Sequence, residues 1–387
     1  MRFLLLFLLA FLAGNTASAR DSNNICVLTW DASDSENCLA KPAKGFSNDS
    51  ITQIVFGPDR SAYLIGLPWS KGGGWDITVS KILVDGRLEW EARVASERVE
   101  FVNSIALSSD GNIAICGFRQ TEGRIRKKGT FLALFNPDGD LVWEKTYFHH
   151  GPSHCDGVTF MANNDIVLVG NQLGNFEYIP FILRISSSGE ILWSNFFDKL
   201  NEGKFDAVSV FLEDQILIGA NEWDIEKDGV MPYLIHLSGS GSVKAHMKLD
   251  FINGERITHF AYSESDGVFF GGTPFFDSDS VFGTIKTTGT IEWHGIHPSP
   301  DAQIVIDVEI LDTGELIALT HDQSNQVFKI IEFGREKKPD REISLPGCED
   351  SAYPEGALSP SGDVFVTCGK NLLRASIVSD DDGVKSD

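Results

Sequence analysis

The sequence lacks an apolar stretch long enough to cross a membrane. The apolar run from Phe3 to Leu12 is shorter than the roughly 20 residues that a bilayer requires, and no later stretch reaches that length. Arg2 precedes this run, and Ala17-Ser18-Ala19 follows it as a small-x-small cleavage pattern. These features predict a signal peptide over residues 1–19 and a secreted or periplasmic protein without membrane insertion.

Basic residues are also scarce. The 387 residues include 32 Lys and Arg against 55 Asp and Glu, which gives a formal net charge of −23 at pH 7. A chain this acidic repels the phosphates of nucleic acid and of anionic membranes, so we expect neither as a partner. The charge favours solubility and cationic partners. Residues 380–387 form an acidic tail after the expected domain, 20–379.

The cysteines lack the spacings of common metal and redox motifs. No two of the six form C-x-x-C or C-x-x-C-H, so zinc-ribbon, thioredoxin-like and c-type haem proteins are not indicated. An even number in an exported chain suggests three disulfides, although six cysteines allow 15 pairings. The candidates are Cys26, Cys38, Cys116, Cys155, Cys348 and Cys368.

No stretch shows helical periodicity, but short apolar strands recur about every 50 residues and mark seven units. These strands end at Gly66, Gly117, Gly170, Gly219, Gly271, Thr320 and Gly369. In the second unit, "NSIALSS", "NIAICGF", "TFLALFN" and "LVWEKTY" are separated by polar turns and a loop, which indicates a four-stranded antiparallel meander. Repeats of this kind are typical of β-propellers. The sequence therefore predicts an all-β, seven-bladed β-propeller.

Closure of the ring requires a strand from the other end of the chain. The seventh unit offers only three strands, near 353–359, 363–368 and 371–377. We expect the N-terminal strand "ICVLTWDA" (25–32) to close the last blade. Four cysteines then meet at this seam, namely Cys26, Cys38, Cys348 and Cys368. Cys116 is left to pair with Cys155 between the second and third units.

A second motif, Gly-x-x-x-Trp, follows the same period. It occurs as Gly86/Trp90, Gly139/Trp143, Gly189/Trp193 and Gly289/Trp293, while Ala245 takes the place of Trp in the fourth unit. The units, over about residues 50–378, resemble the quinoprotein-like repeats of PQQ-dependent dehydrogenases and of the BamB-type outer-membrane assembly propeller. A broad class of exported bacterial propellers is more similar still. The resemblance implies that the Gly permits a tight turn and that the Trp docks one blade onto the next, so these eight residues are structural.

The match to the quinoprotein family is partial. The family's longer motif has a Thr before the Gly, and only Thr288 preserves it here. The vicinal cysteine pair common in PQQ alcohol dehydrogenases is absent. We therefore predict no cofactor. No Ser stands in the Gly-x-Ser-x-Gly context that suggests a hydrolase nucleophile.

Two groups of residues are candidates for binding. His149, His150 and His154 stand in one loop and can ligate zinc or copper, or belong to a solvated loop between blades. Acidic residues recur where the innermost strands begin, at Asp156, Asp206, Asp307 and, less well aligned, Glu355. Near the propeller axis they can surround a cation or a basic ligand, or bind backbone N–H groups of adjoining turns.

These observations favour a monomeric, non-catalytic propeller that serves as a binding or scaffold module for a protein or another extracellular ligand. Its loops are the expected binding surface, because function concentrates in loops on a rigid frame. The alternative is an exported enzyme, either a quinoprotein-like dehydrogenase or a metal-dependent hydrolase or lactonase. Surface adhesion is a third hypothesis.

Overall fold

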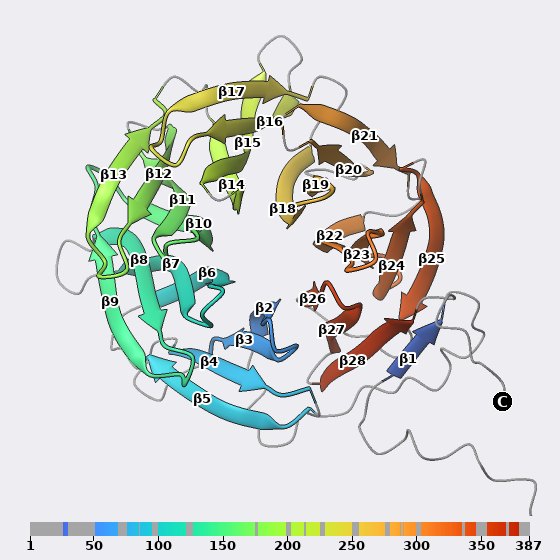
Figure 1. Ribbon diagram of the computed structural model, residues 1–387. Helices are drawn as coiled ribbons and strands as arrows, with labels where there is room; N and C mark the ends of the chain where they lie inside the picture. Colours follow the sequence, from blue (N-terminus) through green and yellow to red (C-terminus); the bar gives the residue numbers. More distant parts are fainter. Residues whose placement is uncertain are drawn as a thin grey trace, which may run out of the picture.

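The fold is an all-β, seven-bladed propeller, as the sequence predicts. The computed structural model describes residues 26–29, 51–68, 76–84, 86–94, 100–120, 127–174, 177–198, 203–212, 214–224, 229–249, 255–274, 279–286, 288, 290–298, 303–334, 337–345, 354–368 and 371–378. Within these ranges the strands form seven four-stranded sheets, arranged as blades around a central axis (Figure 1). No helix in the described part of the chain is long and apolar enough to cross a membrane.

Each of the first six blades is an antiparallel meander that runs from the axis outwards. Blades 1 to 3 comprise β2 (Ile51–Phe56), β3 (Ala62–Gly66), β4 (Ile77–Ile82) and β5 (Leu88–Val94); β6 (Glu100–Leu107), β7 (Ile113–Gln120), β8 (Lys128–Phe135) and β9 (Leu141–Tyr147); β10 (Ser153–Phe160), β11 (Ile166–Leu173), β12 (Tyr178–Ile185) and β13 (Ile191–Phe196). Blades 4 to 6 comprise β14 (Lys204–Phe211), β15 (Gln215–Asp224), β16 (Gly229–Leu237) and β17 (Val243–Lys248); β18 (Glu255–Ser263), β19 (Gly267–Pro274), β20 (Ser280–Ile285) and β21 (Ile291–His297); β22 (Gln303–Ile310), β23 (Leu316–Asp322), β24 (Val327–Phe333) and β25 (Pro339–Leu345).

The seventh sheet contains β26 (Gly356–Leu358), β27 (Asp363–Cys368), β28 (Asn371–Val378) and β1 (Cys26–Thr29). β1 pairs with β28 in parallel, with Cys26 opposite Ala375. Trp30, the signal-peptide segment and the acidic tail lie outside the described residues, as do Cys38, Cys348 and the side chains of Cys26 and Cys368. Closure by the N-terminal strand and the cysteine seam therefore stay predictions.

The burial pattern explains why the sequence folds this way. Second strands are covered on both faces by neighbouring blades, so β11 begins with the apolar run 166–170 and is buried up to Gln172. Outer strands such as β13 alternate between half-buried and exposed positions. A core cluster fills each junction between adjacent blades, including the one where Phe365 of blade 7 joins Leu64 of blade 1. Because packing on both faces removes apolar surface from water, it stabilises the ring.

The two ends of the ring differ in their connections. We call the end where the innermost strands begin the loop face, and the opposite end the turn face. On the turn face, five-residue turns recur, such as Asn136–Asp140, where Gly139 has φ 86° and its N–H donates to Asn136 O at 3.0 Å. Some connections on the loop face are longer, namely those between β3 and β4, β7 and β8, β13 and β14, and β25 and β26, whereas others, such as the one between β11 and β12, are as short as the turns. Binding residues are often located on loops that a rigid frame holds in place, so we expect a binding site on the loop face.

The repeated tryptophans contact the turn of the following blade. Trp143 Nε1 donates to Ser187 O at 2.8 Å, and Trp193 Nε1 donates to Gly239 O at 3.1 Å. A Cβ added at Gly139 would lie 2.7 Å from the Trp90 ring. The Trp293 ring lies 5.8 Å from that of Phe333 in blade 6. Gly86 and Gly189 have φ values of 80° and 82°, and Gly289 lies outside the described residues.

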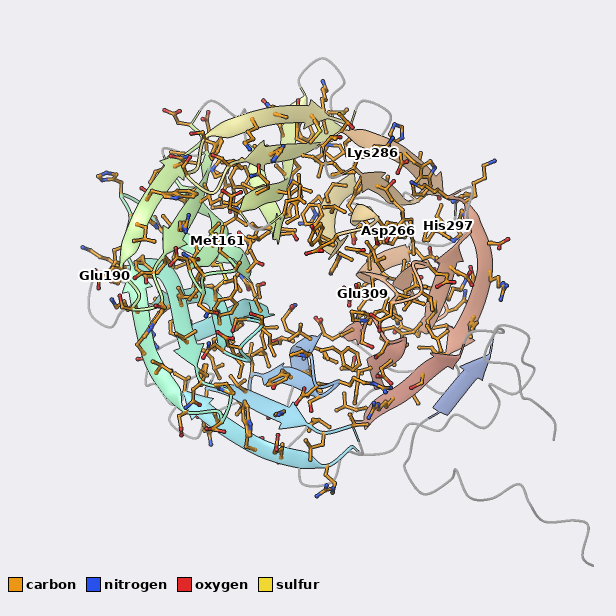
Figure 2. All side chains as sticks on the ribbon, in the orientation of Figure 1. Met161, Glu190, Asp266, Lys286, His297 and Glu309 are labelled. Carbon is orange, nitrogen blue, oxygen red and sulfur yellow. A yellow bond between two sulfur atoms is a disulfide. The ribbon has the colours of Figure 1, made fainter. Side chains whose placement is uncertain are left out.

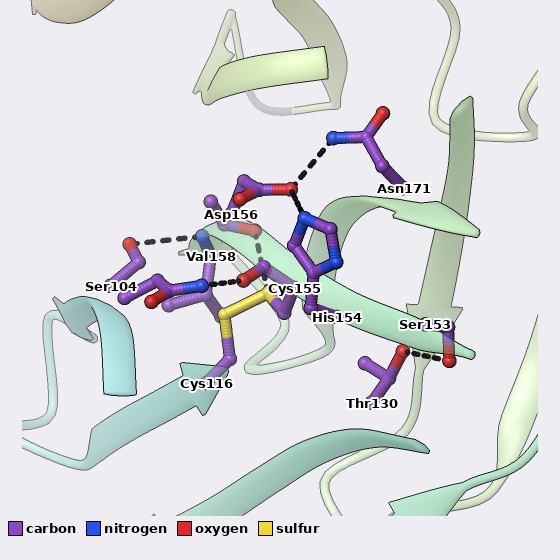
Figure 3. Close-up of a disulfide and its surroundings, with 11 residues drawn as sticks. Ser104, Cys116, Thr130, Ser153, His154, Cys155, Asp156, Val158 and Asn171 are labelled. Carbon is purple, nitrogen blue, oxygen red and sulfur yellow. Dashed lines mark hydrogen bonds and ion pairs between the residues drawn. A yellow bond between two sulfur atoms is a disulfide. The ribbon is translucent and has the colours of Figure 1, made fainter. Parts of the chain in front are cut away.

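One disulfide is confirmed within the described residues. Cys116 of β7 and Cys155 of β10 are bonded, with their Cα atoms 5.7 Å apart (Figure 3). Both side chains are fully buried in the core cluster between blades 2 and 3. The bond therefore joins two adjacent blades close to the loop face.

Candidate functional site

A β-bulge near the start of the innermost strand recurs in blades 1 to 6. The strand register shifts by one residue at Thr52, Asn103, Asp156, Asp206, Thr258 and Ile306. A bulge leaves one residue out of the ladder and changes the direction of its side chain. These bulges place two of the predicted acidic residues, Asp156 and Asp206, at equivalent positions of adjacent blades.

Asp156 belongs to a hydrogen-bond network between blades 3 and 4. Asn171 Nδ2 donates to Asp156 Oδ2 at 2.7 Å, and His154 Nε2 lies 3.2 Å from the same oxygen (Figure 3). Asn171 also donates to Phe205 O at 3.0 Å and accepts from Phe205 N at 3.1 Å. The carboxylate is thus fixed by residues that also hold the two blades together.

Asp206 repeats this arrangement one blade further on. Asn221 Nδ2 donates to Asp206 Oδ2, with the same spacing of 15 residues as in Asn171 and Asp156. Nη1 of Arg256, in blade 5, lies 3.5 Å from Asp206 Oδ1. Burial, assisted by the charge of Asp156, raises the pKa of Asp206 to about 6, although Arg256 acts in the opposite direction.

Cations flank these carboxylates on both sides. The Lys128 ammonium lies 3.6 Å from the Phe118 ring centre, and burial lowers its pKa against the opposing effect of Asp156. The Lys204 ammonium lies 4.2 Å from the Tyr178 ring centre. Such contacts stabilise partly desolvated cations. We call Lys128, His154, Asp156, Lys204, Asp206 and Arg256 the inner cluster; it extends over blades 2 to 5.

Large apolar side chains are exposed at the same end of blades 2 to 4. We call the following four residues the apolar rim: Phe148 (50% exposed), Leu173 (40%), Tyr178 (36%) and Trp223 (36%). Tyr178 contacts the inner cluster, because the Lys204 ammonium lies over its ring and the ring lies 6.4 Å from that of His154. The loop face therefore offers apolar contact area beside fixed charges.

The structure separates the three histidines that were candidate metal ligands. His149 packs against Phe181 and Phe196, with ring centres 4.7 and 5.4 Å away, and burial lowers its pKa. His154 pairs with Asp156, and His150 is exposed. Within the described ranges, no three His, Cys, Asp or Glu side chains come together in a group that could hold a metal ion.

Asp307 and Glu355 lie apart from this network, on blades 6 and 7. Ile306, rather than Asp307, occupies the bulge position of blade 6. Asp307 accepts hydrogen bonds from Leu358 N of blade 7 at 2.8 Å and from Val308 N at 2.9 Å. Burial raises the pKa of Asp307 to about 7 and that of Glu355 well above its usual range. The prediction that Asp307 is equivalent to Asp156 and Asp206 is therefore wrong by one residue.

Glu309 was missed because it lies two residues beyond Asp307 and three beyond the bulge position of blade 6. Figure 2 places it on the inner side of the ring. Burial and the neighbouring Asp307 raise the pKa of Glu309 to about 8. Lys204 and Arg256 were also missed, although a periodic signal exists. Together with His154, they stand two residues before the bulge in three successive units.

The raised pKa of Asp307 makes a prediction about stability. In the unfolded chain the pKa of an aspartate is about 4, whereas in the folded protein the pKa of Asp307 is about 7. Between these two pH values the folded protein therefore holds the proton of Asp307 and the unfolded chain does not. The contribution of this proton to the free energy of unfolding is fully present below about pH 4 and is lost as pH rises through 7. We expect Asp307→Asn, which cannot ionise, to lose less stability between pH 5 and pH 8 than the unchanged protein in urea unfolding.

Asp110→Asn is the matched control, because Asp110 is an exposed aspartate that also accepts a hydrogen bond, from Asn164 Nδ2 at 2.7 Å. It should retain the pH dependence of the unchanged protein. Equal pH dependence in Asp307→Asn would contradict the assignment.

Comparisons with known proteins support the fold and no family. No protein-family model and no curated protein matches the sequence. Among solved structures, Sqt1 from Chaetomium thermophilum is 10% identical with a TM-score of 0.52, over 88% of this chain and 98% of that one. A glucose dehydrogenase is 11% identical with a TM-score of 0.47, over 74% and 96%. A protein of unknown function from Bacteroides caccae is 14% identical with a TM-score of 0.43, over 73% and 93%. At these identities the likeness concerns the fold alone.

Proposed function

We propose that this protein is an exported binding or scaffold module whose loop face binds a protein partner. The observation that carries the proposal is the position of the apolar rim beside the inner cluster, with Tyr178 of the rim in contact with Lys204 and His154 of the cluster. Tyr, Trp and Arg are the residues that most often dominate the binding energy of protein interfaces. Here Tyr178, Trp223 and Arg256 lie at the same end of adjacent blades.

The charges of the inner cluster support a partner that presents acidic side chains. Lys128, Lys204 and Arg256 concentrate positive charge at one end of a chain whose net charge is −23. Asp206, with its pKa raised to about 6, opposes them less at mildly acidic pH. Complementary charge would guide association and set the orientation, while the apolar rim would supply most of the affinity.

Two observations support export. The expected signal peptide at residues 1–19 directs the chain out of the cytoplasm. The disulfide between Cys116 and Cys155 fits an oxidising compartment, because cytosolic proteins rarely keep such bonds.

The test is capture by cross-linking of a partner from the exported fraction of the producing cells, followed by direct measurement of Kd with the purified partner. Tyr178→Ala should weaken binding by about 30-fold, as expected for an interface residue worth about 2 kcal/mol. Leu141→Ala is the matched control, because Leu141 is 44% exposed on the outer strand β9. It should leave Kd unchanged.

Equal affinities of Tyr178→Ala and the unchanged protein would refute binding at the loop face. The enzyme alternative has its own test, which is absorbance and metal analysis of the purified protein. Bound PQQ or a stoichiometric metal would favour that alternative over a binding module.

A further inference from the structure

A cavity opens between blades 5 and 6 on the turn face, away from the inner cluster. Its volume is about 900 Å³, and turns from both blades line it. Figure 2 labels Asp266 and Lys286, two of its lining residues, on this side of the ring. The size suits a small flexible ligand. The core of this junction is filled by the cluster that includes Phe269 and Phe333, so the opening lies among the turns of the two blades.

A change in the repeated turn accompanies this opening. In blades 2, 3 and 4 the position of the turn with positive φ is Gly139, Gly189 and Gly241. A Cβ at these glycines would lie 2.7 to 3.1 Å from Trp90, Lys145 and Trp193 of the preceding blade, so those junctions are filled. In blade 6 the same position is Lys337, with φ 57° and an N–H that donates to Gly334 O at 2.7 Å.

The side chain of Lys337 crosses the junction to blade 5 rather than filling it. Its ammonium bonds to the Glu292 carboxylate and lies 3.3 Å from Thr284 Oγ1. In the turn between β22 and β23 of blade 6, a Cβ added at Gly314 would meet no atom within 4 Å, which shows open space beside that turn. The lining thus already holds one primary ammonium group with a carboxylate and a hydroxyl.

The cavity is lined by more acidic side chains than basic ones. Five acidic side chains line it, namely Asp266, Glu292, Glu315, Glu332 and Asp340, against Lys286 and Lys337. Both lysines lie near the same acid, with Lys286 Nζ 3.7 Å from Glu292 Oε1. Asp266 accepts hydrogen bonds from the hydroxyls of Ser263 and Ser265, and Glu315 from the hydroxyl of Thr313, and a hydroxyl carries no charge that would balance a carboxylate. The lining therefore disfavours anions and apolar ligands.

We propose that this cavity binds a flexible ligand carrying two or more primary ammonium groups. One ammonium would meet Asp266 and another Glu315, on the turns that face each other across the junction, and the remaining hydroxyls would accept or donate further hydrogen bonds. A free polyamine and a lysine-bearing peptide share this chemistry. The site is independent of the loop face and of any partner bound there.

The test is calorimetric titration of the full mature chain with two probes, spermidine and a blocked Gly-Lys-Gly-Lys-Gly peptide. The double variant Asp266→Asn/Glu315→Gln should weaken binding of the better probe by about tenfold, equivalent to about 1.4 kcal/mol. Asp138→Asn/Asp140→Asn is the matched control, because both residues are exposed on a turn of blade 2 on the same face. It changes the net charge equally and should leave the affinity unchanged.

Each outcome decides the proposal. Preference for spermidine identifies a free polyamine, and preference for the peptide identifies a lysine-bearing partner; both support the site if the double variant is weakened and the control is not. Absence of heat with both probes overturns it. Equal weakening in the control also overturns it, because the attraction would then come from the overall charge. A calcium titration that blocks both probes would reassign the carboxylates to a metal ion and refute ammonium recognition.

Discussion

Gly170→Ala is expected to lower the free energy of unfolding by about 4 kcal/mol or more, measured by guanidinium unfolding with the disulfide intact. Gly170 ends the apolar run of β11 and lies opposite Cys155, next to the bulge at Asp156. A Cβ at this position would lie 2.0 Å from His154 O and 3.0 Å from Cys155 Cα. Both atoms are backbone, so the first strand of the blade must move away from the second.

The control is Ala220→Gly in blade 4. Ala220 lies opposite Phe205, just before the bulge at Asp206, and so occupies the same register as Gly170. Because an alanine already fits there, its replacement should cost only about 1 kcal/mol, the usual effect of glycine in a strand. Unchanged stability of Gly170→Ala would show that the bulge can relax, and that the close approach to His154 O carries no energetic weight.

The same glycine illustrates how much of the fold the sequence predicts. The run "DIVLVG" and its copies showed the period of the repeat, because buried second strands must be apolar on both faces and must end where the backbones come close. The number of strands in each unit followed from the turns, where glycines such as Gly139 adopt positive φ. These local rules repeat in every blade, so the period survives the loss of individual copies such as Ala245.

The candidate site was predictable only in part. Asp156 and Asp206 were found because an acid stands at the same place in two units, but the position of a bulge depends on pairing between strands and cannot be read from one strand alone. In blade 6 this moved Asp307 one residue away from the repeated position. The partners of these acids also lie far away in the sequence, as in the pair of Asp206 and Arg256, so a local pattern does not reveal them.

The cavity between blades 5 and 6 accompanies the loss of the repeated Gly-x-x-x-Trp motif in the sixth unit. The sequence shows this loss, but it does not show the resulting cavity. The sequence around Lys337, "EFGREKKPDREISL" (332–345), contains no Gly-x-x-x-Trp motif. Only the structure shows that Lys337 replaces a glycine of positive φ and bonds to Glu292 of the preceding blade. A missing motif indicates altered packing, but the side chain that takes its place decides whether the space is filled.

Removal of the disulfide is the second change that we expect to lower stability strongly. Cys116→Ala/Cys155→Ala should lower the free energy of unfolding by about 4 kcal/mol, because the bond closes a loop of 39 residues and restricts the unfolded chain. Both residues are fully buried between blades 2 and 3, so loss of their packing adds to this cost. The sequence predicted this pairing because the other four cysteines were assigned to the seam, and the structure confirms it.

Other cysteines complicate the measurement, so the effect is best taken as a difference. The unchanged protein and the double variant are each unfolded in urea with and without reductant. Reduction should destabilise the unchanged protein by the full amount, while the double variant should respond only through Cys26, Cys38, Cys348 and Cys368. An equal response of both proteins to reductant would place the stabilising bond elsewhere, at the seam that those four cysteines are expected to form. A larger response of the unchanged protein would instead assign the stability to the joint between blades 2 and 3, where Cys155 immediately precedes the bulge at Asp156.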